Sequence, residues 1–488
     1  MTIIKLMTYI GIVALVVTAL TIYLKKSKNY GITYLQHFAG ILFLVSGFVK
    51  AVDPLGTAFK TEQYFDAFYY TLEGTKLSFM ASIFPFLNQY VNAFSIGTIV
   101  LEMMLGVMLI LGVLPKLTSW IFLLLMLFFT SLTGFTFLTG YVPPDANFFE
   151  FSKWGPYVDS NMRVSDCGCF GDFIKIVPKT SFLKDIFLLI PAILFLMYHK
   201  KFHTLLTSGA RLGITIASFV AFMFYCLNYT YWNEPSIDFR PFKEGVNVRE
   251  QKQREMEAEA NRPVFQVITP KAGGESITLS SEEYAKRWKE FPKEEFDIVQ
   301  QTGESEMEHS KISDFRVTDE RDEDVTEQIL SDTGYSLMII NYKVKLDFED
   351  KQVEVADTTF APVDSMATDS LATPAIVSIK KTIENIQIPK FMPDWVQLYN
   401  DKITPLLKKA EEEKMSACII FGGLSTEQIN LATKTLDITV PAYQADETIL
   451  KTIIRSNPGI LLWKDGAIIK KWHINKAPEW KEIQEYMK

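Results

Sequence analysis

Two cysteines separated by one glycine are the residues of this chain best suited to chemistry. Cys167 and Cys169 lie in the run Asp166-Cys167-Gly168-Cys169-Phe170-Gly171-Asp172. Thiols this close can form a reversible disulfide in an oxidising compartment, and Gly168 supplies the backbone freedom that so tight a ring needs. A closed metal site would need about four ligands, and no other Cys or His lies in this loop. Spacing alone does not choose between a reactive pair and a structural disulfide.

Glu102 is the second candidate, because it lies within an apolar segment. It stands about ten residues into the run from Asn92 to Val113, which places it near the middle of a membrane-spanning helix at roughly 1.5 Å per residue. An ionisable group in lipid is costly, so such a residue is a functional candidate by default. Glu102 could carry protons for a quinone or thiol reaction, or it could be a protonated packing residue that fixes the helix register. The sequence favours neither.

The remaining cysteines and the histidines carry no comparable signal. Cys226 lies in an apolar segment and Cys418 in the apolar run Ala417–Phe421, as small buried hydrophobic residues do. The five histidines are scattered, and no Gly-rich phosphate loop, Ser-His-Asp set or metal-spaced His/Cys set is present. We therefore expect no bound metal.

Six apolar segments predict the elements that position these residues. A helix needs roughly 20 apolar residues to cross a bilayer, and only a helix satisfies its own backbone there. Nearly uncharged segments of about this size occur at 6–24, 33–49, 92–113, 117–140, 182–197 and 212–232. We predict an α-helical membrane bundle with six transmembrane helices, in which residues 1–30 form an extra N-terminal helix before a bundle at 31–232.

The two halves of the chain differ in charge. Residues 1–232 hold 16 Lys/Arg and 11 Asp/Glu, a net +5, and residues 233–488 hold 33 and 46, a net −13, which together give the −8 of the whole chain. This asymmetry favours one body in lipid and one in water. It excludes a purely soluble enzyme and a basic nucleic-acid binder, so lipid is an expected partner and nucleic acid is not.

Lys and Arg in the short loops predict the orientation of the bundle. The loops after the first, third and fifth segments hold Lys25, Lys26, Lys28, Lys116, Lys200, Lys201 and Arg211. If these loops are cytoplasmic, then segments 51–91 and 141–179 and the whole C-terminal half face the exterior or periplasm. We therefore expect a multi-pass inner-membrane protein with a periplasmic C-terminal domain and with its cysteine pair in an oxidising space.

Three motifs carry a family resemblance. They are the run Ser46-Gly47-Phe48-Val49-Lys50-Ala51-Val52-Asp53-Pro54-Leu55-Gly56, Glu102 with Gly106, and the 166–172 run before Lys184-Asp185. Together they resemble the DoxX family, and more narrowly the branch near the methylamine-utilisation protein MauE, over about residues 31–245. Each motif is weak alone, whereas the combination is specific.

The resemblance implies a DoxX-like four-helix core formed by the second to fifth segments. It also implies a role in periplasmic disulfide formation or quinone-linked redox chemistry, with a quinone as the cofactor. The motif residues it marks are Lys50, Asp53, Asp166, Asp172, Lys184 and Asp185. Taken alone, Lys50, Asp53, Lys184 and Asp185 lie at the outer ends of their helices, where snorkelling explains them. Relatives often carry Arg early in the first core helix, where this chain has Gln36-His37.

The C-terminal half predicts a second fold. Residues 233–308 form a charged linker and a small β-rich element. From residue 309 to 488, strands at 335–342 and 417–421, helices at 393–414 and 425–436, and a hairpin at 459–472 follow one another in the order of a thioredoxin-like α/β domain of the TlpA and peroxiredoxin type. Pro458 occupies the place of that fold's cis-proline, or it is an ordinary trans turn proline.

The dithiol motif of such a domain is missing. Cys-x-x-Cys would follow the strand ending near Tyr342, where this chain reads Lys343-Val344-Lys345-Leu346-Asp347, and no cysteine lies between Cys226 and Cys418. The domain cannot exchange disulfides by itself, and we expect it to bind or dock a partner. The Ser/Thr/Ala/Pro/Asp composition of 349–378 predicts a disordered insert.

Two functions remain open at this point. The first is a membrane protein for thiol-disulfide or quinone-linked electron transfer at the periplasmic face, with Cys167, Cys169 and Glu102 as its reactive residues and a periplasmic or membrane protein as its partner. The second is a non-catalytic membrane scaffold or assembly protein, in which the C-terminal domain binds a partner and the disulfide staples a loop. The sequence does not decide whether the protein is an enzyme.

Overall fold

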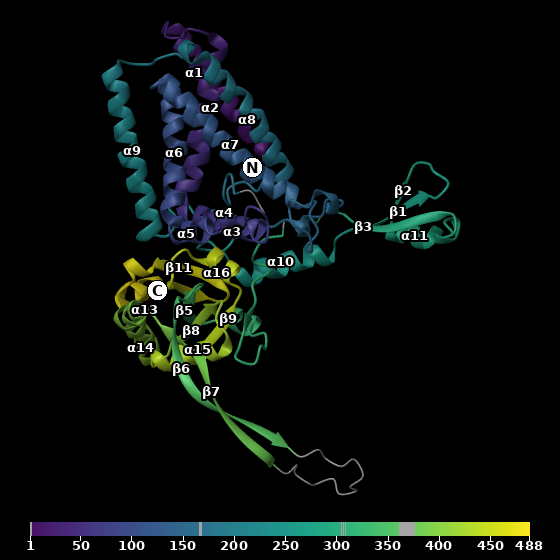
Figure 1. The fold of residues 1–488 in the computed structure, drawn as a ribbon, viewed down its shortest axis with the longest axis vertical. Coiled ribbons are helices and arrows are strands. Elements are labelled where there is room, and N and C mark those ends of the chain that lie inside the picture. The colour runs from purple at the N-terminus through teal and green to yellow at the C-terminus, as the bar shows by residue number, and fades with distance from the viewer. Residues whose placement is uncertain (1, 165–167, 304, 306, 308, 361–375) are drawn as a thin grey trace. The chain divides into compact units, whose positions relative to one another are not determined.

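The computed structural model describes residues 2–488 except 165–167, 304, 306, 308 and 361–375 (Figure 1). The chain divides into two compact units. The first comprises residues 1–243 together with 452–456 and 471–477, and the second comprises 244–451, 457–470 and 478–488.

Six long apolar helices build the first unit and confirm the predicted membrane spans. They are α1 (Ile3–Tyr23), α2 (Tyr30–Val52), α6 (Val91–Leu111), α7 (Pro115–Thr139), α8 (Pro178–Tyr198) and α9 (Ser208–Tyr231). Asn29 caps α2 and Thr207 caps α9 through side-chain oxygens that accept backbone N–H groups. Pro115 and Pro178 open α7 and α8, where the missing N–H of proline costs nothing.

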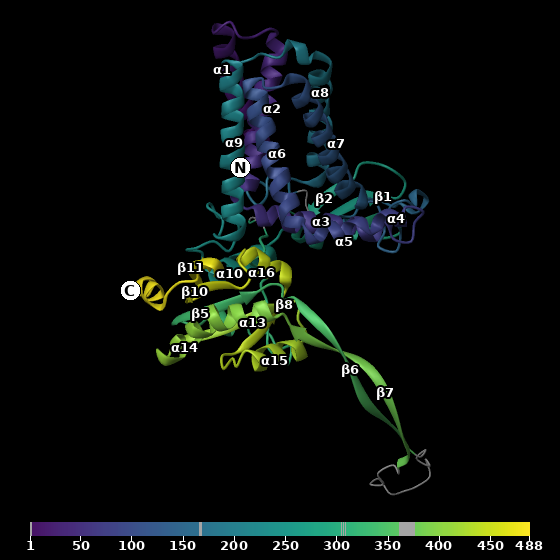
Figure 2. The same ribbon diagram turned by 60° about the vertical axis from the view of Figure 1, so that its left-hand side comes forward.

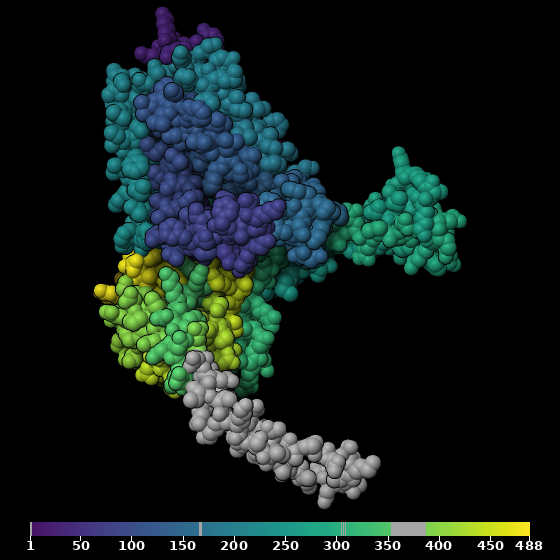
Figure 3. Space-filling model, viewed as in Figure 1, coloured from purple at the N-terminus to yellow at the C-terminus, as the bar shows by residue number. Residues whose placement is uncertain are grey.

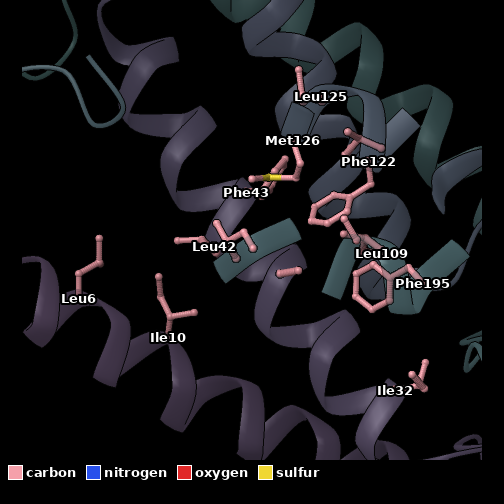
Figure 4. Close-up of a cluster of buried hydrophobic side chains, with 14 of the residues drawn as sticks. Leu6, Ile10, Ile32, Leu42, Phe43, Leu109, Phe122, Leu125, Met126 and Phe195 are labelled. Carbon is pink, nitrogen blue, oxygen red and sulfur yellow. The ribbon is translucent and has the colours of Figure 1, made fainter. Parts of the chain in front are cut away.

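Helices α2 and α6 pack closely because small residues face each other. A Cβ on Gly40 would lie 3.0 Å from the carbonyl oxygen of Gly106, and a Cβ on Gly106 would lie 2.8 Å from that of Gly40. Such close backbone approach is typical of membrane helices. The rings of Phe43, Phe122 and Phe195 join α2, α7 and α8 in one buried cluster (Figure 4), with centroids 4.8 Å and 5.5 Å apart.

Three shorter helices lie across one end of the bundle. They are α3 (Pro54–Leu72), α4 (Ser78–Ala81) and α5 (Ile83–Gln89), and they occupy the end where α2 and α7 finish and α6 and α8 begin (Figures 1 and 2). The Asp53 side chain caps α3 by accepting the Gly56 N–H at 3.0 Å. In the space-filling view these helices form the continuous surface at that end of the face in view (Figure 3).

The turn between α6 and α7 requires glycine at position 112. Gly112 has φ +68°, and a Cβ there would lie 1.9 Å from the carbonyl oxygen of His203. We expect Gly112→Ala to destabilise the protein by at least about 2 kcal/mol, from left-handed strain and overpacking. Gly213→Ala is the matched control, because a Cβ at Gly213 meets nothing within 4 Å. Thermal unfolding in detergent checks this, and equal loss in both variants would contradict it.

The second unit begins with α10 (Val248–Ala260) and a small three-stranded sheet. The strand order is β2-β1-β3, from β1 (Val264–Pro270), β2 (Ile277–Ser280) and β3 (Phe296–Thr302), and all pairs are antiparallel. Helix α11 (Ser281–Arg287) follows β2. Ile268, Leu279 and Phe291 form the core of this element.

A six-stranded sheet follows in the order β11-β10-β5-β8-β9-β4. Its strands are β4 (Val317–Thr318), β5 (Tyr335–Asn341), β8 (Ser416–Gly422), β9 (Ala442–Ala445), β10 (Gly459–Lys464) and β11 (Ala467–His473). Strands β5, β8 and β9 are parallel, and β10 is antiparallel to β5. The helices are α12 (Thr326–Leu330), α13 (Pro393–Leu398), α14 (Thr404–Glu412), α15 (Thr426–Thr435), α16 (Glu447–Ile453) and α17 (Trp480–Tyr486). A π-helical turn at Tyr399–Ile403 divides the helix predicted at 393–414.

The disordered insert predicted at 349–378 is corrected at both ends. Strands β6 (Leu346–Phe360) and β7 (Ile376–Phe391) pair as a long antiparallel hairpin, with Leu346 opposite Phe391. Residues 361–375 lie outside the described residues. The composition typical of disorder is concentrated in 357–375, whereas the run 376–391 holds five Ile and one Val, residue types that favour strands.

Candidate functional site

A cavity of about 290 Å³ lies within the first unit, in the half of the bundle next to α3 and α5. Eight phenylalanines contribute to its wall, namely Phe43, Phe65, Phe68, Phe84, Phe94, Phe128, Phe129 and Phe170. Five residues singled out in the sequence also line it, namely Lys50, Glu102, Cys169, Lys184 and Asp185. An apolar cavity with a few converging polar groups is the usual form of a small-molecule site.

Lys50 and Glu102 form a buried ion pair on one side of this cavity. The Lys50 Nζ lies 2.6 Å from the Glu102 Oε2, and the two residues are 8% and 2% exposed. Lys50 Nζ also lies 4.7 Å from the centroid of the Phe129 ring, a cation–π distance. Snorkelling therefore does not describe Lys50: it turns inward because Glu102 compensates a charge that would otherwise be costly in an apolar interior. This partner of Glu102 was not foreseen.

Lys184 and Asp185 form a second ion pair near the start of α8. Thr133 of α7 donates a hydrogen bond to Asp185 Oδ2 at 2.9 Å, and Asp185 is only 1% exposed. The snorkelling explanation is therefore also wrong for Asp185. Lys50 and Lys184, two of the three lysines that line the cavity, therefore come from different helices, and each pairs with its own carboxylate.

Cys169 is among the residues that line the cavity. Its Sγ lies 3.0 Å from the Ser181 hydroxyl, and its carbonyl oxygen accepts a hydrogen bond from Ser46 at 3.1 Å. Burial raises the pKa of the Cys169 thiol, although the Lys184 cation acts in the opposite direction. The other reactive candidate, Cys167, and its neighbour Asp166 lie outside the described residues.

Asp53 and Asp172 are not among the residues lining the cavity, and they meet at Arg455 instead. Arg455 belongs to segment 452–456 of the first unit and is 6% exposed. Its Nη2 lies 2.6 Å from Asp53 Oδ2 and 3.8 Å from Asp172 Oδ2. Burial raises the pKa of Asp53, but the Arg455 guanidinium outweighs it and holds that pKa below its usual value. Sequence reasoning missed Arg455, which follows Asp53 by 402 residues.

Pro458 is likewise not among the cavity-lining residues. The Asn457–Pro458 peptide bond is cis.

Residues 28–144 match the family described as methylamine utilisation protein MauE. The match runs from just before α2 to just after α7 and contains Lys50, Asp53 and Glu102, and it ends before Cys169, Lys184 and Asp185. Together with the six apolar helices, this similarity indicates a multi-pass membrane protein. No curated protein and no solved structure matches the chain.

Proposed function

We propose that this protein is a membrane-embedded thiol-disulfide redox protein in which the Cys167/Cys169 pair is coupled to a quinone held in the cavity. One observation carries the proposal. Cys169 lines an apolar cavity that is also lined by the Lys50–Glu102 and Lys184–Asp185 ion pairs.

The cavity residues fit a quinone headgroup. Such a ring is flat and apolar, with oxygens on opposite sides that accept hydrogen bonds. Phenylalanine rings suit its faces. Lys50 from α2 and Lys184 from α8 offer cationic donors from two different helices, and charge-assisted hydrogen bonds of this kind are strong. Glu102 and Asp185 balance the charges of Lys50 and Lys184, so these two ion pairs require no charged ligand.

The chain's own residues prepare the thiol and handle the protons. The Ser181 hydroxyl is within hydrogen-bond distance of the Cys169 sulfur. The Lys184 cation acts to lower the pKa of the Cys169 thiol against the effect of burial. Lys50 Nζ donates a hydrogen bond to Glu102 Oε2 beside the cavity, and we assign the proton transfer to this pair. When bound, the quinone supplies the oxidant: the two thiols lose two electrons and two protons as their S–S bond forms, and the quinone takes up both and becomes the quinol.

The proposal includes a compartment and a partner. We take the basic loops to be cytoplasmic. The N-terminus, segments 51–91 and 141–179 and the C-terminal half then lie on the periplasmic side of an inner membrane, where a disulfide is stable. We assign the six-stranded sheet of the second unit to a thioredoxin-like domain that docks a reduced partner protein. The parallel β5, β8 and β9 with antiparallel β10 support this assignment. Such a domain carries its dithiol after the first of these strands, where this chain has Lys343-Val344-Lys345-Leu346. We therefore assign the domain a binding role.

The rate at which Cys169 is alkylated should keep rising as the pH is raised well above about 8.5, the pH at which an ordinary thiol is half ionised. Burial raises its pKa, so its reactive thiolate accumulates only at higher pH. Lys184→Gln removes the opposing cation and should shift the profile to still higher pH. Mass spectrometry of the alkylated Cys169 peptide, in a Cys167→Ser background, measures this. The control is Lys179→Gln, an exposed lysine of the same helix. An unchanged profile in Lys184→Gln would remove Lys184 from the proposal.

A non-catalytic scaffold is the second candidate. The raised pKa of Cys169 favours it, because an un-ionised thiol is less reactive. A partner complex that keeps its stoichiometry in the Cys167→Ser, Cys169→Ser double variant would support the scaffold, whereas loss of a mixed disulfide with the partner would support the redox function.

A further inference from the structure

The lining of the cavity is buried on one side and partly exposed on the other. Phe43, Ile99 and Met126 are 3%, 0% and 1% exposed, and they close the side formed by the middle of α2, α6 and α7. The partly exposed lining residues include two groups of different chemistry. Their partial exposure points to two places where the cavity approaches the surface of the first unit.

The first group is polar, and we call it the polar mouth. It consists of Thr57, Lys60 and Thr61 of α3 with Gly168, Cys169 and Lys184. Helix α3 and the 168–170 loop meet here, since a Cβ on Gly168 would lie 3.0 Å from the Lys60 Cγ. Cys169 therefore lies at the polar mouth.

The second group is apolar, and we call it the apolar mouth. It consists of Phe84 and Leu87 of α5, Phe94 and Thr98 of α6, and Phe128 and Leu132 of α7. The turn at 112–114 joins α6 and α7, which stand apart toward α5 (Figures 1 and 2). The Phe94 and Phe128 rings meet there edge to face, with centroids 6.2 Å apart. Because both helices are membrane spans, this mouth opens toward lipid.

We propose that the cavity takes its ligand from the lipid through the apolar mouth, and that the ligand class is a quinone with a long hydrocarbon tail that stays between α6 and α7. This inference rests on the proposed function. An apolar tail is favourable against Phe94, Phe128 and Leu132 and unfavourable in water. Thiols and protons then reach the cavity from water through the polar mouth, whereas the quinone reaches it from lipid through the apolar mouth.

Two threonines give a matched test, one at each mouth. Thr98 donates to the Phe94 carbonyl and Thr61 to the Thr57 carbonyl, each at 2.9 Å and one helical turn back. Thr98→Trp and Thr61→Trp therefore each remove a hydrogen bond that lies within a single helix, while the indole fills the mouth. The full-length chain is placed in lipid nanodiscs with a benzoquinone carrying a long isoprenoid tail, or with the same headgroup without a tail. Bound quinone is quantified by extraction after separation.

Thr98→Trp should weaken binding of the tailed quinone at least about tenfold, because the indole takes the place of the tail, and should leave the tail-less one unchanged, whereas Thr61→Trp should leave binding of the tailed quinone unchanged. Equal weakening of both quinones by Thr98→Trp, or loss of the tailed one in Thr61→Trp, overturns the inference. If neither quinone binds the unaltered chain, the proposed function fails instead. Phe128→Ala provides a second variant should Thr98→Trp not fold. It widens the apolar mouth and should speed loading of the tailed quinone alone. If the tailed quinone loads into Phe128→Ala no faster than into the unaltered chain, the inference is overturned.

Discussion

Replacing Lys50 by Met should destabilise the membrane unit by about 3–5 kcal/mol, because it leaves the buried Glu102 carboxylate without its partner. The Lys50 Nζ to Glu102 Oε2 distance is 2.6 Å, and both side chains are almost fully buried. An unpaired charge in this apolar cavity loses its hydration and gains nothing in return. The expected loss is a large part of the stability of an ordinary protein domain.

Thermal unfolding of the purified protein in detergent measures this loss. The double variant Lys50→Met, Glu102→Leu should recover most of the stability, since an apolar pair of similar volume is often as stable as a buried ion pair. Lys153→Met is the matched control. It breaks an ion pair with Glu150 whose side chains are 56% and 42% exposed and should cost less than about 1 kcal/mol. If Lys50→Met lowers the stability no more than Lys153→Met does, the result contradicts a buried ion pair between Lys50 and Glu102.

Cys169→Ser should abolish quinone-dependent thiol oxidation by the reconstituted protein. The reaction needs two sulfurs that end in one S–S bond, and Cys169 is the one that lines the cavity. Serine is close in size and keeps a hydroxyl near Ser181 and the fold around Ser46, so the loss reports chemistry rather than packing.

Cys226→Ser is the control for this experiment. Cys226 lies in α9, is fully buried and is not among the cavity-lining residues. Oxidation of a reduced partner thiol is followed by the appearance of quinol, and Cys226→Ser should keep the unaltered rate. A rate in Cys169→Ser similar to that of Cys226→Ser would move the activity away from this cysteine and favour the scaffold.

The membrane spans were predictable from sequence because the signal is local. A run of about 20 apolar residues can only be a helix in lipid, and the structure forms helices at all six predicted places. The helix predicted at 425–436 is likewise present as α15, with both capping-box hydrogen bonds between Ser425 and Gln428. Each of these predictions depends on residues a few positions apart.

The pairings that build the site were not predictable in the same way. Glu102 was identified as a buried ionisable residue, but its partner Lys50 lies 52 residues earlier at the end of a helix, where snorkelling is an adequate local explanation. Arg455 meets Asp53 across 402 residues, and nothing near Arg455 in the sequence marks it. Hydropathy and spacing place residues on elements, whereas these contacts depend on which helix faces which.

The C-terminal half shows a further limit of composition. The Ser/Thr/Ala/Pro/Asp bias at the centre of 349–378 was extended to flanking residues that pair in β6 and β7. Strand pairing satisfies backbone groups whatever the side-chain composition, so composition alone could not mark where the hairpin ends. The helix predicted at 393–414 was placed correctly, but its π-helical turn at Tyr399–Ile403 had no signal in the apolar periodicity.

The most direct test of the central claim is a single-turnover measurement on the unaltered protein. The purified chain is reduced, freed of reductant and mixed anaerobically with one equivalent of a long-tailed benzoquinone in lipid nanodiscs. Quinol is followed by ultraviolet absorbance, and the Cys167–Cys169 disulfide by alkylation and mass spectrometry. We predict that one quinol forms for each disulfide, with equal rates. Quinol without a disulfide, or no quinol while both cysteines stay reduced, would contradict the account.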